Sequence, residues 1–217
     1  MGVARVTEPV WLFDLDNTLH DATPHVFPRI NRAMTAYIMR ELAVDEAEAN
    51  RLRQTYWSRY GATLRGLVAH HGIDPAHFLW HTHQFPDLDT ILIHDPTLPY
   101  LLPRLPGRKL LFSNAPGHYA QAVLARIGIA RCFERVYAIE RLKLRPKPEV
   151  SAYIKLLSDL RVPASRCVMV EDSLDNLATA KRLGMRTVWV SACTRQPPCV
   201  DIKVRHIRDL YRRLPRL

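Results

Sequence analysis

Residues 10–19 read VWLFDLDNTL, so an apolar run leads directly into two aspartates, Asp14 and Asp16, two positions apart. Such a run predicts a buried strand that ends near Phe13, which places both carboxylates at the carboxyl edge of a sheet. Alternation along the chain turns Asp14 and Asp16 toward a similar side. Because two close carboxylates repel each other, we expect a compensating cation, and Mg²⁺ prefers oxygen ligands. The alternative is a pair of turn or helix-capping aspartates.

Apolar runs elsewhere in the chain predict the rest of the sheet. The five predicted strands are residues 10–13, 109–112, 135–139, 167–170 and 187–190. After residue 109 the strands alternate with segments of helical periodicity. This order is typical of an α/β fold, with a parallel five-stranded sheet and helices on both faces.

A long stretch between the first two strands shows helical periodicity alone. It covers residues 21–96, which is longer than an ordinary crossover between strands. We therefore expect a core made of residues 1–20 and 97–217, with an all-helical insertion at 21–96. The insertion begins at the carboxyl edge of the sheet, where α/β proteins bind ligands.

Three further polar segments follow predicted strands. Ser113 and Asn114 come after the second strand and could bind an anionic oxygen, although a serine there is commonly a helix cap. Lys147 stands between two prolines, which can hold its ammonium in one place, although it could equally face solvent. Glu171 and Asp172 directly follow the fourth strand, where acids also favour a helix N-terminus.

Taken together and in this order, these segments resemble the haloacid dehalogenase-like (HAD) superfamily of phosphohydrolases over essentially the whole chain. The residues that carry the resemblance are Asp14, Asp16, Thr18 and Leu19, then Ser113, then Lys147, then Glu171 and Asp172. The resemblance implies a Rossmann-like core with a mobile all-helical cap of the C1 type.

Three segments are similar to the pyrimidine 5′-nucleotidase branch of that superfamily. They are DNTL at 16–19, YGATLRGL at 60–67 and EDSLDNL at 171–177. Departures from the branch are His20 in place of Tyr, Ala62 in place of Thr, Ala115-Pro116 in place of Gly, and Glu171 in place of Gly or Asp. The resemblance implies a substrate that is a pyrimidine nucleoside 5′-monophosphate or a similar small phosphate.

The resemblance also implies a role for each core residue. Asp14 would be the nucleophile that forms an aspartyl-phosphate, Asp16 the general acid and base, and Lys147 the group that offsets negative charge. Mg²⁺ would be held by Asp14, by the backbone carbonyl of Asp16 and by Asp172, with Glu171 acting through a bound water.

The expected substrate contacts come from both parts of the chain. Ser113 and the N–H of Asn114 would bind phosphate oxygens, and Thr18 would steady the loop of Asp16. In the helical insertion, Tyr60 and Arg65 are the leading candidates for contacting a base or sugar. His20, Tyr56 and Trp57 are further candidates, and packing within the helices is the alternative role for each of these side chains.

Composition limits the other possibilities. Apolar residues make up 47% and charged residues 24% of the 217 residues, which excludes wholesale disorder. No apolar stretch approaches the ~18 residues of a membrane helix, and no signal peptide is visible, so we expect a cytoplasmic protein without a membrane partner. The net charge is +10. We ascribe it to a solvated surface and do not expect a nucleic-acid partner. The oligomeric state stays open.

Two alternatives to a phosphatase remain. A phosphomutase or a 2-haloacid dehalogenase shares the fold, but the dehalogenase reaction needs neither a metal nor Asp16 as an acid. A phospho-receiver module also combines an aspartate, a hydroxyl and a lysine, but lacks the helical insertion.

His77, His81 and His83 could in principle bind a metal, although no acidic or cysteine residue completes that set.

Overall fold

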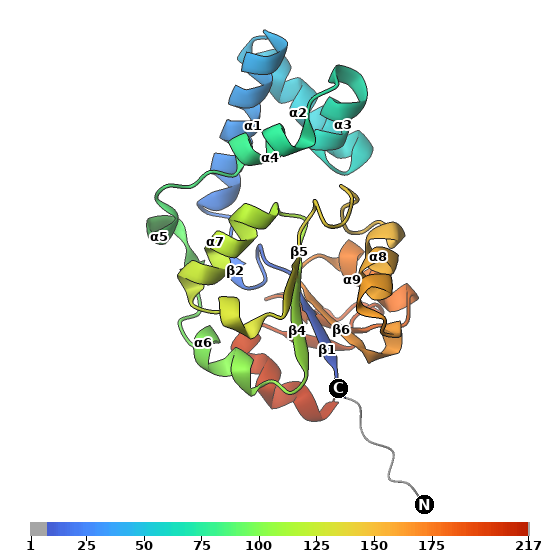
Figure 1. Cartoon of the computed structure of the whole chain (residues 1–217). Helices are drawn as coiled ribbons and strands as arrows, with labels where there is room; N and C mark the ends of the chain where they lie inside the picture. The colour runs from blue at the N-terminus through green and yellow to red at the C-terminus, as the bar shows by residue number, and fades with distance from the viewer. Residues whose placement is uncertain (1–7, 217) are drawn as a thin grey trace, which may run out of the picture. The chain divides into compact units, whose positions relative to one another are not determined.

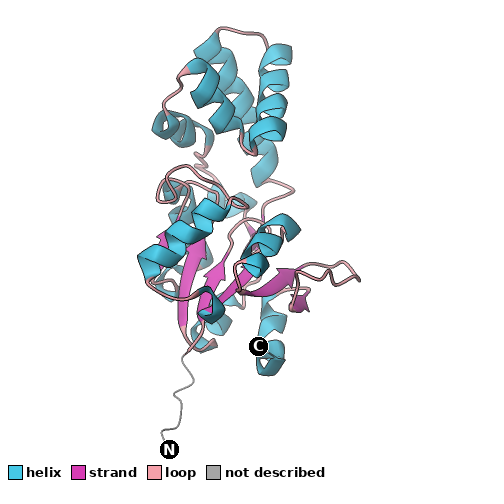
Figure 2. Ribbon diagram, turned by 90° about the vertical axis from the view of Figure 1, so that its right-hand side faces the viewer, coloured by secondary structure: helices cyan, strands magenta, loops and turns pink. Residues whose placement is uncertain are grey.

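The computed structural model describes residues 8–216, with side chains described up to residue 213. The chain folds into two compact units: an α/β unit that ends at Asp21 and resumes at Ile93, and a helical unit, Ala22–Leu92. In the α/β unit a sheet runs through the middle, and helices cover both of its faces (Figures 1 and 2).

Over residues 8–216 the sheet has six strands, and each is parallel to its neighbours. In spatial order they are β5 (Arg135–Tyr137), β4 (Arg108–Phe112), β1 (Val10–Phe13), β6 (Cys167–Glu171), β7 (Arg186–Val190) and β8 (Ile202–Val204). All four residues of β1 are buried because β1 lies between β4 and β6 and both faces of the sheet are covered. The predicted α/β class is confirmed.

The prediction of five strands was wrong by one, the strand predicted at 135–139 was two residues too long, and the bounds of β4, β6 and β7 each differ from the prediction by one residue. The sixth strand, β8, has only three residues and follows a loop containing Pro197 and Pro198. Val204 is the last residue of β8. The strand predicted at 135–139 ends at Tyr137, because the chain turns at residues 139–144.

The helices that cover the sheet come from the second half of the chain. Helix α7 (Gly117–Ile127) lies on one face, and α8 (Val150–Leu160) and α9 (Leu174–Arg182) lie on the other (Figure 1). On the second face, Leu12 and Met169 belong to one buried cluster with Leu156 and Leu177. Short helices at Leu98–Leu101 (α6), Leu102–Arg104, Ala130–Cys132 and Ala164–Arg166 connect these elements, and a 3₁₀ helix, Ile207–Arg216, follows β8.

The helical unit is built from α1 (Val26–Leu42), α2 (Glu46–Tyr60), α3 (Thr63–His71), α4 (Pro75–Thr82) and α5 (Leu88–Ile91). Asp45 begins α2 by accepting the N–H of Glu48 at 2.8 Å, which is the usual work of an N-cap aspartate. Gly61 ends α2 with a φ of 74°, a conformation that glycine adopts without strain. Where the chain leaves and re-enters the α/β unit, β2 (His20–Asp21) pairs antiparallel with β3 (Ile93–His94).

Over the described residues, none of the helices combines the length and the apolar character that crossing a bilayer requires.

Candidate active site

A tight turn after β1 places the two aspartates of the first segment. The backbone N–H of Asp14 donates to Val170 at 3.0 Å, so the pairing of β1 with β6 continues one residue past the strand. The N–H groups of Thr18 and Leu19 then both donate to the carbonyl of Leu15, and Asn17 takes the left-handed conformation with a φ of 60°. Asn tolerates this conformation better than most residues.

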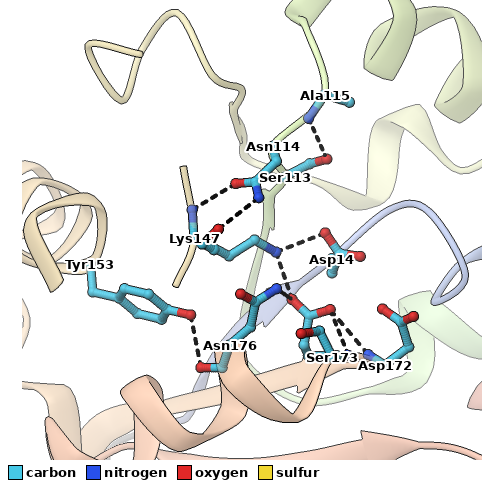
Figure 3. A network of polar contacts seen from close by, with 10 residues as sticks. Asp14, Ser113, Asn114, Ala115, Lys147, Tyr153, Asp172, Ser173 and Asn176 are labelled. Atoms are coloured by element: carbon cyan, nitrogen blue, oxygen red, sulfur yellow. Dashed lines mark hydrogen bonds and ion pairs between the residues drawn. The ribbon is translucent and has the colours of Figure 1, made fainter. Parts of the chain in front are cut away.

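Lys147 joins Asp14 to the end of β6. Its Nζ donates to Asp14 Oδ1 at 2.7 Å (Figure 3). It also donates to Glu171 Oε2 at 2.7 Å, and all three side chains are buried. The ring of Phe112 lies 5.1 Å from the ammonium. Burial alone would lower the pKa of Lys147, but the two carboxylates keep its pKa above the usual value. The lysine is therefore a fixed positive charge beside Asp14.

Glu171 is surrounded by hydrogen-bond donors. Oε2 accepts from Lys147 and from Asn176 Nδ2 at 3.0 Å, and Oε1 accepts from the backbone N–H groups of Asp172 and Ser173 at 3.1 and 3.2 Å. Burial opposes ionisation, but Lys147 and the other donors outweigh it and hold the pKa of Glu171 below its usual value. Glu171 is thus a buried carboxylate whose two oxygens are already engaged.

Asp14 and Asp172 resist ionisation in this setting. Burial, followed by the charge of Glu171, raises the pKa of Asp14 well above its usual value, although Lys147 opposes this effect. Burial, and then Glu171, raises the pKa of Asp172 to about 7. Oxygen atoms of Asp14, Glu171 and Asp172 all lie within 4.8 Å of one another. A hard cation fits such a set because its charge relieves the repulsion and carboxylate oxygens are its preferred ligands.

The segment after β4 holds the backbone of Lys147 in place. Asn114 Nδ2 donates to the carbonyl of Lys147 at 2.9 Å, and Asn114 Oδ1 accepts the N–H of Lys147 at 2.8 Å (Figure 3). Ser113 is buried, and its Oγ accepts the N–H of Ala115 at 3.1 Å. The side chain of Asn114 therefore fixes the backbone of Lys147, a contact that the sequence did not reveal.

Asp16 takes part in a separate group of contacts, with His20 and Tyr119. Its Oδ1 is 2.9 Å from His20 Nε2 and accepts the hydroxyl of Tyr119 at 2.8 Å. Burial, then the charge of Asp16, raises the pKa of Tyr119, so its hydroxyl remains a donor. His20, expected as a base or sugar contact, is instead buried against Asp16. Thr18 is buried too, and its Oγ1 has no hydrogen-bond partner among the described residues.

The predicted contacts of the helical insertion lie within the helical unit. The hydroxyl of Tyr60 is 2.6 Å from His70 Nε2, and Arg65 Nη1 donates to the carbonyl of Tyr60 at 3.2 Å. Tyr56 is buried over Gly66, where a Cβ would come within 2.1 Å of its ring, so Tyr56 is a packing residue. Trp57 is 67% exposed.

His77 and His81 lie in α4 and His83 directly follows it, and among the described residues they are not part of a group of three or more potential metal ligands. His77 Nδ1 is 2.7 Å from the hydroxyl of Tyr37, and His83 is buried with its ring against Thr82. Within residues 8–213, the cluster of Asp14, Glu171 and Asp172 is the one group of three or more potential metal ligands.

Sequence reasoning overlooked two residues that complete this geometry. Tyr119 belongs to the buried face of α7 by periodicity, and nothing in that spacing distinguishes a packing tyrosine from one that bonds Asp16. Trp189 donates its indole N–H to the carbonyl of Asp172 at 2.8 Å, at the end of the neighbouring strand. Only the register of β7 against β6 shows this contact.

Two known proteins are similar in sequence to most of this chain. Phosphate metabolism protein 8 of Saccharomyces cerevisiae is 28% identical over 193 residues, which cover 81% of this chain and 59% of the yeast protein, so the chain spans less than two thirds of that relative. Phosphoglycolate phosphatase of Colwellia psychrerythraea is 26% identical over 197 residues, covering 84% of each chain.

Among solved structures, a HAD phosphatase from Thermococcus onnurineus has the same fold, with a TM-score of 0.66 and 22% identity over 95% of this chain and 97% of that one. An L-2-haloacid dehalogenase from Xanthobacter autotrophicus also shares the fold, with a TM-score of 0.60 and 18% identity over 95% and 98% of the two chains. Residues 10–184 match the haloacid dehalogenase-like hydrolase family, and the chain belongs to that family.

Proposed function

We propose that the protein is a Mg²⁺-dependent phosphomonoester hydrolase that works through an aspartyl-phosphate on Asp14. The observation that carries the proposal is the buried carboxylate of Asp14. Its Oδ1 is engaged by Lys147 at 2.7 Å, and within residues 8–213 no hydrogen bond reaches its Oδ2. A nucleophile of this kind needs nearby positive charge, because it must approach a phosphoryl group that is itself negative.

In the first step an oxygen of Asp14 attacks phosphorus, and the bond from phosphorus to the ester oxygen breaks. Asp16 gives its proton to that leaving oxygen. In the second step water attacks the phosphoryl group on Asp14, Asp16 takes a proton from the water, and the bond between Asp14 and phosphorus breaks. Lys147 offsets the negative charge on Asp14 and phosphate throughout, and Ser113 and the N–H of Asn114 bind phosphate oxygens.

Mg²⁺ would be held by Asp14, Asp172 and the backbone carbonyl of Asp16. When bound, it supplies positive charge that neutralises the phosphoryl oxygens. Because hydrogen bonds already engage both oxygens of Glu171, its role in this proposal is to orient Lys147 and to reach the metal only through water.

For the substrate, we propose a pyrimidine nucleoside 5′-monophosphate or a similarly small phosphate. The support is the likeness of residues 60–67 and 171–177 to the pyrimidine 5′-nucleotidase branch. The helical unit would act as a cap, with Tyr60 and Arg65 contacting the base or sugar and Thr18 serving near the phosphate. Phosphoglycolate is the second candidate, because the Colwellia relative is named a phosphoglycolate phosphatase and matches over 84% of each chain.

The mechanism is tested with two single substitutions. Asp14→Asn should abolish release of phosphate from p-nitrophenyl phosphate, because the amide cannot attack phosphorus. Asp16→Asn should leave an acid-stable phosphoenzyme that mass spectrometry detects, because hydrolysis of the aspartyl-phosphate then lacks its base. Near-normal turnover by Asp14→Asn would show that the nucleophile is wrongly assigned.

The substrate and the metal are tested by kcat/KM for a panel of phosphates. UMP and CMP should be preferred over purine nucleotides, sugar phosphates and phosphoglycolate, and EDTA should stop turnover until Mg²⁺ is restored. Saturation binding of UMP should weaken in Arg65→Ala. A preference for phosphoglycolate would overturn the nucleotide assignment and leave the phosphatase mechanism in place. Release of chloride from L-2-chloropropionate without a metal would favour a dehalogenase.

A further inference from the structure

Two hydrogen-bond donors converge on one oxygen of Asp16. The hydroxyl of Tyr119 and Nε2 of His20 lie 2.8 and 2.9 Å from Oδ1. The side chain of His20 is fully buried, Tyr119 is 1% exposed, and the side chain of Asp16 keeps 19% of its surface exposed. Within residues 8–213 no hydrogen bond reaches Oδ2. The two oxygens of this carboxyl group are therefore unequal.

The local fold makes this arrangement. The turn at Leu15–Leu19 folds the chain back, and an isolated bridge pairs the backbones of Asp16 and His20. The imidazole of His20 thus returns to the side chain that begins the turn. Tyr119 comes from the first turn of α7, which starts directly after the segment containing Ser113.

The surroundings of His20 indicate which of its ring nitrogens carries the hydrogen-bonding proton. Its Nδ1 is buried and has no hydrogen-bond partner among the described residues. A proton on Nδ1 would therefore be a buried donor with nothing to accept it, which is costly. A proton on Nε2 avoids this cost, because Asp16 Oδ1 lies 2.9 Å away and accepts it in a hydrogen bond.

We infer that His20 and Tyr119 are positioning residues, which hold Asp16 so that Oδ2 carries and delivers the proton to the leaving group. This inference rests on the proposed phosphatase function. While Asp16 is protonated on Oδ2, its Oδ1 is a carbonyl oxygen that accepts two ordinary hydrogen bonds. As the proton passes from Oδ2 to the ester oxygen, negative charge spreads onto Oδ1.

That charge strengthens both hydrogen bonds, because hydrogen bonds to an ionised acceptor are about twice as strong as neutral ones. The gain appears only as the proton leaves, so it stabilises the transition state more than the bound substrate. The contribution must therefore depend on the leaving group. An alkoxide is a strong base and needs the proton, whereas p-nitrophenolate is a weak base and can leave without it.

The test compares kcat/KM for benzyl phosphate and p-nitrophenyl phosphate, which are similar in size and differ in the basicity of the leaving oxygen. General acid catalysis is worth ~10²–10⁴-fold. Tyr119→Phe and His20→Leu should each lower kcat/KM for benzyl phosphate by ~10–100-fold, part of that factor, and lower it for p-nitrophenyl phosphate by less than about 3-fold. His20→Gln, which keeps an N–H near the position of Nε2, should recover much of the loss.

Tyr137→Phe is the matched control. Tyr137 is also fully buried in the α/β unit, but its hydroxyl has no hydrogen-bond partner among the described residues, so both substrates should be unaffected. In an Asp16→Ala background, Tyr119→Phe should no longer change the ratio of the two substrates, because the group that it positions is absent. Circular dichroism melting curves check that each variant is folded.

An equal loss for both substrates in Tyr119→Phe and His20→Leu would overturn the inference, since a purely structural role affects both reactions alike. Wild-type values of kcat/KM for both substrates in both variants would overturn it as well, and would leave the phosphatase function intact. Failure of the wild-type protein to hydrolyse either ester would instead refute the proposed function, and the inference with it.

Discussion

Replacing Lys147 with Met tests how strongly the buried ion network depends on its one ammonium. Methionine preserves most of the aliphatic volume, so the main change is that Glu171 loses its counter-ion. A buried carboxylate that has lost its counter-ion can become neutral by taking up a proton. At pH 7 the protonation of a carboxyl group with the ordinary pKa of Glu171, 4.5, costs about 3.4 kcal/mol at ~1.36 kcal/mol per pH unit. We expect a loss of about 3 kcal/mol at pH 7, close to the ~3–5 kcal/mol typical of a broken buried pair.

The pH dependence of that loss has a definite sign. In the wild type the pKa of Glu171 is lowered, so its contribution to stability is present above pH 4.5 and is lost as the pH falls through the folded-state value. In the folded variant the pKa of Glu171 rises, so below pH 7 the folded state holds one proton more than the unfolded chain. The deficit relative to the wild type should therefore shrink by ~1.4 kcal/mol per pH unit toward pH 5.

Urea unfolding in EDTA at pH 7, 6 and 5, followed by circular dichroism, measures both effects. The matched control is Lys155→Met, which breaks the partly exposed pair with Asp159 at 2.6 Å and should cost less than about 1 kcal/mol at every pH. The reasoning fails if Lys147→Met costs no more than this control. It also fails if the cost of Lys147→Met stays constant from pH 7 to pH 5.

Two further substitutions probe the support of the site and the packing of the helical unit. Asn114→Ala removes both hydrogen bonds to the backbone of Lys147, so kcat for p-nitrophenyl phosphate should fall about 10-fold with a stability loss of ~1–3 kcal/mol; unchanged kcat would refute the support role. Gly66→Ala places a Cβ 2.1 Å from the ring of Tyr56, so urea unfolding should show a loss of ~1–3 kcal/mol; a stability equal to that of the wild type would contradict this packing.

The convergence of the core residues was predictable because parallel strands set it. Asp14, Ser113 and Glu171 each lie at the carboxyl end of a buried apolar run, and in a parallel sheet all such ends meet at one edge. The register of β1 against β4 and β6 then fixes which residues are neighbours. The apolar runs therefore determine the site to within a residue or two, even though their members are far apart in sequence.

The hydrogen-bond partners of Asn114 and Tyr119 were not predictable in the same way, although Asn114 lies two residues past the end of β4. Asn114 and Tyr119 have ordinary loop and helix positions, and the acceptors that they bond lie in distant segments. Tyr56 was a candidate for stacking on a base because aromatic residues often do so, but the absent Cβ of Gly66 gives its ring a place between α2 and α3. Helical periodicity shows which face is buried and says nothing of the partner that covers it.

In the proposed reaction, the charges of the site would couple the binding of phosphate to the binding of the metal. One ammonium, that of Lys147, is bonded to the carboxylates of Asp14 and Glu171, and the carboxyl groups of Asp16 and Asp172 lie nearby. Without another cation these groups leave net negative charge where, in the proposed reaction, a phosphate dianion would approach, and the raised pKa values of Asp14 and Asp172 express the same imbalance. Mg²⁺ would correct it by two charges. Lys147 alone cannot, because its charge is already shared by two carboxylates.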